Sequence, residues 1–433
     1  MQEVNFNAKD LVDQKESSLE NLSPTVPPKQ SKFRTWYNNL SSNQKTVFFA
    51  TVMVGIAFIL GVITFAWILI RTNFIKTHNT ITSTKVSTKI PPKTTTKKVT
   101  KEYQDPLDGV YVTNQSTLQK PPLAVMIENY YPDARPQMGL DEADLVYENQ
   151  VEGGITRFMA VFLANSPTMV GPIRSAREYY ISWALGIGAI YAHWGGNIYA
   201  LQELQNTNIP SIDGIDFNAP DCSTSGYIFC RSSQRLAPHN AYGNTVNMWS
   251  YAQSQGLYSA SDAQLGSNIT PYKFAKTPKQ SLLGANGSTI NITFSANPDY
   301  NVQWVYDQSN NNYIRYNGGT LQYDALNNQE VVAKNVVVMY VSGSESSYPG
   351  DGTTEPYSLI WILNTTGSGK ATIFNNGQEI QGTWTKSSDT SRMTFTDSNG
   401  NPITFQRGTI WFEILQPQTG SFTYTPGTTS TNI

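Results

Sequence analysis

The sequence has little charge, little histidine and very little cysteine. Charged residues make up 14% of the 433 residues, against roughly 25% in an average soluble domain. The net charge is -2 and no basic domain stands out, which argues against a nucleic-acid-binding protein. Two cysteines without a second pair exclude a zinc site of the Cys-x-x-Cys kind. We predict neither a metal site nor a cofactor.

The three histidines are too few for a dedicated metal site, and one of them, His78, falls in a polar segment. A metal could still be held by His193 and His239 together with Asp213 or Asp216. We regard this alternative as the weaker one. No internal repeat with a fixed period is present either, which excludes a solenoid.

One long apolar run, residues 46–70, contains no charge at all. About 20 apolar residues span a bilayer core, so we predict a single transmembrane helix. A cleaved signal peptide is the competing interpretation, although its apolar region would be about 7–15 residues long and nearer the N-terminus. Basic residues are balanced on the two sides of the run, so they do not decide its orientation. We expect the C-terminal part outside the cytoplasm because it is rich in Asn, Ser and Thr and has two cysteines close enough to pair.

Composition divides the rest of the chain. The fold class we predict is α+β: a mixed α/β domain followed by a β-rich domain, both placed after the transmembrane helix and a disordered linker. The predicted divisions are a disordered cytoplasmic tail (1–45), the helix (46–70), a Thr/Lys/Pro-rich linker (71–105), the mixed α/β domain (106–262), the β-rich domain (263–417) and a flexible tail (418–433).

Short apolar runs bounded by turn residues predict buried strands in the mixed domain. Glu128, Glu148 and His193 would each lie at the C-terminal end of one, at the rim where α/β sheets bind ligands. The runs are 124–127, 144–147, 158–163 and 189–194. Helices are predicted over 198–204 and from Pro238 onward, and strands in the second half over 331–341, 359–363 and 409–415, with Gly-containing hairpin turns at 317–319, 376–377 and 398–400.

A helix is also predicted after a Gly-Pro pair, over 173–185. It would carry Arg174 and Arg177 in its first turn, where two guanidiniums and free backbone N–H groups form an anion site. The alternative is that both arginines pair with neighbouring acids such as Glu178 and Asp144.

Several ordered motifs resemble a known family. They are P-L-A-V-M-I-E-N, A-R-P-Q-M-G-L, A-D-L-V-Y-E, E-G-G-I-T-R-F, G-P-I-R-S-A-R-E-Y, H-W-G-G and A-P-H-N-A-Y. From about Pro121 to about Pro417 the chain is similar to the YerB-type family of bacterial lipoproteins, a two-part domain of unknown function. The resemblance implies an extracytoplasmic envelope protein and no established reaction. The family is usually anchored by a lipidated cysteine, and since this chain has none before Cys222, the helix is expected to replace the lipid.

We predict one shared anion-binding cleft of six residues, formed by Arg174 and Arg177 with Glu148, Glu152, Arg157 and His193. The catalytic candidates are Glu128, Glu148 and Glu152, and the ligand-binding candidates are Arg157, Arg174, Ser175, Arg177, His193, His239 and Asn240. Ser175 is a weak nucleophile candidate because no G-x-S-x-G elbow surrounds it. In an oxidising compartment Cys222 and Cys230 would form a disulfide.

Two functions fit this cleft. The first is binding or scaffolding on peptidoglycan or another anionic wall polymer, with wall-synthesis proteins as further partners. The second is cleavage or transfer of a wall glycan, in which a glutamic acid protonates the leaving oxygen. We favour binding, since arginines and aromatic side chains recognise such polymers without turnover.

Overall fold

The computed structural model describes Ser41, Gln44 and residues 102–259, 269–276, 283–349 and 357–427. The chain divides into two units, residues 1–96 and 97–433, and the account below concerns the second. The predicted transmembrane segment, 46–70, lies outside the described residues, as do most of the predicted tail and linker. Among the helices that are described, none is both long and apolar enough to cross a membrane.

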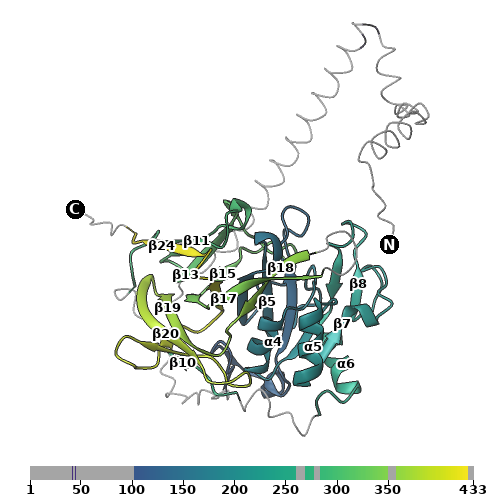
Figure 1. Ribbon diagram of the computed structural model, residues 1–433, viewed down its shortest axis with the longest axis horizontal. Coiled ribbons are helices and arrows are strands. Elements are labelled where there is room, and N and C mark those ends of the chain that lie inside the picture. Colours follow the sequence, from purple (N-terminus) through teal and green to yellow (C-terminus); the bar gives the residue numbers. More distant parts are fainter. Residues whose placement is uncertain are drawn as a thin grey trace, which may run out of the picture. The chain divides into compact units, whose positions relative to one another are not determined.

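A ten-stranded sheet runs through this unit in the order β21-β20-β19-β16-β23-β4-β5-β3-β6-β7. Figure 1 labels β19 and β20 of one side, β5 of the middle and the edge strand β7. Its middle strands are buried along their whole length and are mostly apolar, with a few polar residues among them, as expected of a sheet covered on both faces. The strands are β3 (Leu123–Glu128), β4 (Leu145–Gln150), β5 (Thr156–Phe162), β6 (Ile190–His193), β7 (Ser211–Asp213), β16 (Asn335–Tyr340), β19 (Gly367–Asn375), β20 (Gln378–Lys386), β21 (Thr394–Asp397) and β23 (Ile410–Leu415).

The two halves of the chain meet within this sheet. Strand β23, from the second half, pairs in parallel with β4, from the first. The hydrophobic clusters on the two faces each contain residues from both halves. On one face Tyr147 stacks on Phe412, and on the other Phe158 meets the edge of Trp411. The two predicted parts therefore share one core, and the predicted boundary at 262/263 lies outside the described residues.

A second sheet covers one face of the first. Its strands run in the order β14-β13-β12-β11-β24, with β15 beside β13. Burial alternates along β12 and β13, and the inward side chains, among them Trp304 and Tyr313, join the hydrophobic cluster of the large sheet. The strands are β11 (Thr289–Thr293), β12 (Val302–Asp307), β13 (Asn312–Asn317), β14 (Thr320–Leu321), β15 (Val332–Ala333) and β24 (Ser421–Thr425).

Few helices accompany the strands, so the unit is mostly β (Figure 1). Tyr180 and Trp183 of α4 pack on the face opposite the second sheet, together with Tyr147. The helices are α4 (Glu178–Leu185), α5 (Ile198–Thr207) and α6 (Thr245–Ser254), with single 3-10 turns η1 (Gln115–Leu118), η2 (Glu152–Gly154), η3 (Gly214–Asp216) and η5 (Pro298–Tyr300). Four strand pairs complete the fold: β1 (Tyr103–Gln104) with β2 (Tyr111–Val112), β8 (Phe229–Arg231) with β9 (Ala241–Gly243), β10 (Lys273–Phe274) with β22 (Thr404–Phe405), and β17 (Gly343–Pro349) with β18 (Tyr357–Leu363).

Most predicted elements are present, and the differences have local causes. The helix predicted from Pro238 begins only at Thr245, because Ala241–Gly243 first pairs with β8. The predicted flexible tail 418–433 is wrong at its start. There Phe422 and Tyr424 of β24 pack on Phe374, which holds the strand in the second sheet. The predicted linker likewise ends in strand β1.

Candidate functional site

Polar side chains gather at one end of the central strands of the large sheet. Strands β3, β4 and β6 all end there, and β5 begins there, because β5 is antiparallel to its neighbours β3 and β4 and β6 is parallel to β3. Glu128 ends β3 and pairs with Arg157 at the start of β5. His193 ends β6 as predicted, whereas Glu148 is followed by two more residues of β4.

Glu128 is the centre of the part of this end that reaches solvent. Its carboxylate is buried, with 3% of the side chain exposed, and contacts an arginine and a histidine from other segments. The Nε atom of Arg174 lies 2.9 Å from Glu128 Oε1, and His239 Nδ1 lies 3.0 Å from Oε2. Tyr130 stacks on the His239 ring with a centroid distance of 4.8 Å. We name Glu128, Arg174 and His239 the glutamate cluster.

The predicted helical anion site is wrong. Arg174 lies in an extended segment whose backbone pairs with β3, and the backbone of Arg177 is also extended (φ −135°, ψ 144°), so α4 begins only at Glu178. Buried Ile173 and Ala176 form β-bridges to Ile127 and Gly196, and this pairing overrides local helix propensity. Both arginines do pair with acids, as the alternative expected, but the partners are Glu128 and Glu152 rather than Glu178 and Asp144.

Arg177 and Glu152 form a forked ion pair. Arg177 Nε and Nη2 each donate to one Glu152 oxygen at 2.6 Å. Burial raises the pKa of Glu152, but Arg177 and Arg157 lower it more, so the net shift is downward. Arg157 is itself buried and donates to the Ser175 carbonyl at 2.7 Å. Burial, with a contribution from Arg177, lowers the pKa of Arg157 to about 10.

The other predicted residues are distributed over separate contacts. His193 is buried beside Asp213, 3.8 Å from its carboxylate, and its pKa is lowered by burial. Asn240 accepts a hydrogen bond from Arg231 at 2.7 Å. Cys222 and Cys230 are joined by a disulfide. The six residues expected to form one cleft therefore belong to several neighbouring groups rather than to one.

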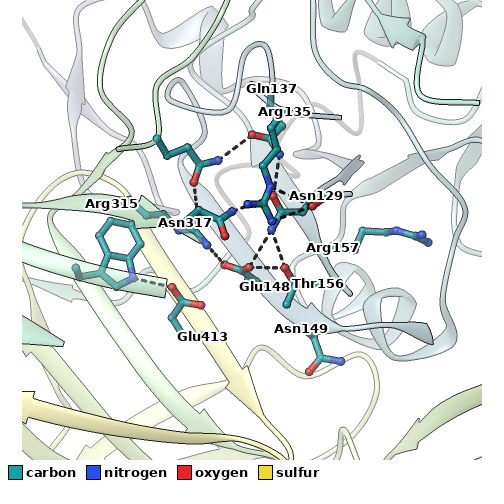
Figure 2. A network of polar contacts seen from close by, with 12 residues as sticks. Asn129, Arg135, Gln137, Glu148, Asn149, Thr156, Arg157, Arg315, Asn317 and Glu413 are labelled. Carbon is teal, nitrogen blue, oxygen red and sulfur yellow. Dashed lines mark hydrogen bonds and ion pairs between the residues drawn. The ribbon is translucent and has the colours of Figure 1, made fainter. Parts of the chain in front are cut away.

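Glu148 belongs to a largely buried polar network that Figure 2 shows from close by. It contacts Arg315 of β13, and neither side chain is exposed to solvent. Thr156 donates to Glu148 Oε1 at 2.7 Å, and Asn129 donates to Thr156 at 2.7 Å. The Arg315 guanidinium lies 4.7 Å from the centroid of the Trp411 ring. This network joins β13 of the second sheet to the large sheet.

A second glutamate is held in the same network. Glu413 of β23 lies opposite Glu148 in register and accepts a hydrogen bond from Trp304 Nε1 at 2.6 Å (Figure 2). Burial raises the pKa of Glu413 well above its ordinary value, and the charge of Glu148 raises it further. Burial thus favours the protonated form of Glu413, whereas Glu148 has Arg315 beside it as an ion-pair partner.

The network reaches the surface through carboxamides. Gln137 and Asn317 both donate to Asn129 Oδ1, at 3.0 and 2.9 Å, and Gln322 donates to Gln137 at 2.8 Å (Figure 2). Gln137, Asn317 and Gln322 line a cavity of about 280 Å³. We name this cavity the amide pocket; its other lining residues are Tyr131, Pro132, Arg135, Pro136, Thr320, Leu321 and Tyr323.

Arg135 is the charged residue of the amide pocket. Its Nε and Nη2 donate to the Asn129 carbonyl at 3.2 and 3.1 Å, and its guanidinium lies within 5.4 Å of the ring centroids of Tyr131 and Tyr300. Burial, with repulsion from Arg315, lowers the pKa of Arg135 to about 10, so it remains charged at neutral pH.

Two features of the sequence point to this pocket, although the sequence analysis did not predict it. Arg135 and Gln137 stand in the A-R-P-Q-M-G-L motif, yet neither was assigned to the site. Arg315 and Asn317 occupy inward positions of β13, between outward residues. A charged residue on the apolar face of an alternating strand must have a buried partner, and that rule alone would have marked Arg315.

The protein is of a mostly β class, in which both halves of the chain contribute strands to one sheet and a Glu–Arg network is buried. Residues 107–258 match the family described as "Protein of unknown function (DUF3048) N-terminal domain", and residues 290–412 match its C-terminal domain. The chain belongs to this two-part family.

Two comparisons with individual proteins agree. The chain is 28% identical over 317 residues to the Bacillus subtilis (strain 168) protein named "Putative lipoprotein YerB", covering 73% of this chain and 87% of that protein. It also superposes on the crystal structure of YerB protein from Bacillus subtilis with a TM-score of 0.61 and 27% identity, covering 74% of this chain and 99% of that one.

Proposed function

We propose that this chain is an envelope-associated binding protein whose amide pocket recognises a glycan of the cell wall. Association with the envelope is supported by its similarity to a protein named as a lipoprotein. The observation that carries the ligand class is the lining of the pocket. Tyr131 and Tyr323 are 50% and 40% exposed, and they stand beside a half-buried arginine and three carboxamides. Aromatic faces with a few placed polar groups suit a polar ring ligand.

The positive charge of Arg135 supports an anionic polymer. Its guanidinium would attract the carboxylates that peptidoglycan and related wall polymers carry. Arg174 of the glutamate cluster, 27% exposed, is a second candidate contact, since Gln137 lines the pocket and also donates to the Glu128 carbonyl at 3.0 Å. A larger cavity of about 580 Å³ is also lined by aromatic residues, a lysine and a carboxamide, but its Trp384 is only 2% exposed and it does not adjoin the glutamate cluster, so we favour the amide pocket.

Binding is better supported than cleavage. An acid that protonates a glycosidic oxygen needs a raised pKa and access to the substrate. Glu128 and Glu152 are ion-paired with arginines, and the pKa of Glu152 is lowered. Glu148 pairs with Arg315 and has no solvent exposure. None of the three is placed as a free acid facing a ligand.

Co-sedimentation with purified peptidoglycan tests the proposal. The full-length chain, kept in mild detergent because of the predicted 46–70 segment, should sediment with the polymer. Arg135→Ala and Tyr323→Ala should each weaken retention by about ten- to a hundredfold, the loss of one charged or stacking contact. Tyr111→Ala removes a similarly exposed tyrosine outside the pocket and should have no effect. Release of soluble muropeptides would instead favour the enzyme, and equal retention of all variants would exclude the pocket.

A further inference from the structure

Three aspartates form a second carboxylate cluster. It lies at the end of the large sheet where β4 begins, whereas the polar site described above lies where β4 ends. Asp105 and Asp108 lie in the turn between β1 and β2, and Asp144 immediately precedes β4. Each offers one oxygen, and these oxygens all lie within 4.8 Å of one another. The three residues are 0%, 6% and 2% exposed. We name them the aspartate cage.

Among the described residues, no cation forms an ion pair with the cage. No described Lys or Arg nitrogen lies within 4.0 Å of its carboxylates. The charges of Lys120 and Arg392 act favourably on the cage from a distance, but both side chains make their direct contacts elsewhere. Lys120 Nζ lies 3.2 Å from the centroid of the Trp249 ring and donates to Ser166, and Arg392 donates to the carbonyls of Pro106 and Thr270. Buried carboxylates without a paired charge are strongly unfavourable, so the cage requires another source of positive charge.

One oxygen of the cage also lacks any partner. Each aspartate has one oxygen held by a backbone N–H, from Leu107, Val110 and Leu163 respectively. The second oxygen of Asp105, Oδ2, is buried and accepts no hydrogen bond of normal geometry. Buried polar atoms in folded proteins almost always have partners, so an unpaired carboxylate oxygen inside a cluster of carboxylates indicates a missing ligand.

We propose that the aspartate cage binds one Ca²⁺ ion. Carboxylate oxygens are hard ligands, which favours Ca²⁺, Mg²⁺ or Mn²⁺ over softer metals. Oxygens within 4.8 Å of one another can be bridged by an ion with metal–oxygen distances of about 2.3–2.6 Å, as Ca²⁺ has. The cage is buried, so its ion must lose most of its water, and Mg²⁺ dehydrates reluctantly.

Protons are the competitor of the metal. Burial raises the pKa of Asp105 to about 6, and burial together with the charge of Asp105 raises the pKa of Asp108 to about 7. A protonated cage needs no ion, and an ion must displace the protons. The two states differ in consequence, because a metal would bind Asp105, Asp108 and Asp144 together and so join the β1–β2 turn to the start of β4. The ion would then anchor the beginning of the folded unit to the central sheet, independently of the amide pocket.

Radioactive Ca²⁺ uptake by the chelator-treated full-length chain tests this site. We expect one ion per chain, with a dissociation constant of about 0.1–1 mM, as in extracellular calcium modules. Ca²⁺ at about 10 mM should raise the unfolding temperature by roughly 3–8 °C. Asp105→Asn and Asp144→Asn should each reduce the affinity at least about tenfold, because each removes one charged ligand from the cage.

Controls separate the cage from general effects of charge. Asp133→Asn neutralises an exposed aspartate and should bind Ca²⁺ like the unmodified chain. The Asn variants resemble protonated aspartate and should fold in chelator, and Asp108→Asn provides the same test if either fails. Absence of uptake at about 10 mM, preference for Mg²⁺, or uptake that persists in the cage variants would each overturn the proposal.

Discussion

The unit buries two groups of carboxylates that differ in what neutralises them. Glu148 and Glu413 lie side by side on β4 and β23, where Arg315 contacts Glu148 and burial raises the pKa of Glu413. The aspartate cage lies at the other end of the same sheet and is equally buried, but no described Lys or Arg contacts it. The difference is therefore in the source of the positive charge, not in the burial.

That difference determines how each group responds to its surroundings. Arg315 comes from 167 residues further along the chain than Glu148, so its charge is delivered by the fold and is permanent. The cage must take its charge from solvent, as protons or as a cation, and its stability therefore depends on conditions. A charge supplied by the chain serves to hold two sheets together, whereas an exchangeable charge makes the start of the unit sensitive to its compartment.

Removal of Arg315 should have the largest effect, because Glu148 would then be buried without an ion-pair partner, as the aspartate cage is. Arg315→Met leaves Glu148 buried without a counter-charge and should lower the free energy of unfolding by about 3–5 kcal/mol. Urea unfolding monitored by tryptophan fluorescence measures it. The double variant Arg315→Met/Glu148→Gln removes both charges and should recover much of the loss. A single-variant loss below about 1 kcal/mol would show that the pair contributes little.

Apolar patterning predicted the sheet well and the polar contacts poorly. The runs around Val125, Val146 and Val161 became β3, β4 and β5, because four to eight consecutive apolar residues are favourable only inside a sheet covered on both faces. The shared core could not be predicted, since the parallel pairing of β23 with β4 joins segments more than 250 residues apart and nothing local specifies it.

The site shows the same limit. Glu128, Arg174 and His239 were all selected from sequence, and the fold brings them together. The predicted grouping of Arg174 with Arg177 and His193 is not found, because the prediction assumed a helix where Ile173 and Ala176 pair as strand. Local propensity cannot anticipate such bridges, because their partners Ile127 and Gly196 become neighbours only after the sheet forms.

The pH dependence of the free energy of unfolding should reveal Glu413, with an effect smaller than that of Arg315→Met. Its folded pKa lies above the ordinary 4.5, so the native state binds more protons than the unfolded state above that pH. Its contribution to stability is therefore fully present below pH 4.5 and is lost as the pH rises through the folded pKa, by up to about 1.4 kcal/mol per pH unit.

Glu413→Gln imitates the protonated form and should remove this slope while it costs little at low pH. The difference between the two proteins, measured by urea unfolding from about pH 5 to pH 8 under the same conditions, isolates Glu413 from every other titrating group. Equal slopes in the two proteins would mean that Glu413 is already ionised or equally protonated in both states.

Arg174→Ala should have the smallest effect, although Arg174 also pairs with a buried glutamate. Its guanidinium is 27% exposed and screened by water, and Glu128 keeps His239 at 3.0 Å as a second partner. The expected loss in the free energy of unfolding is about 1 kcal/mol or less. Arg174→Lys retains the charge and should lose less still. If Arg174→Ala destabilised the unit as much as Arg315→Met, exposure and a second partner would not be what separates the two glutamates, and this whole end of the sheet would have to be regarded as one buried network.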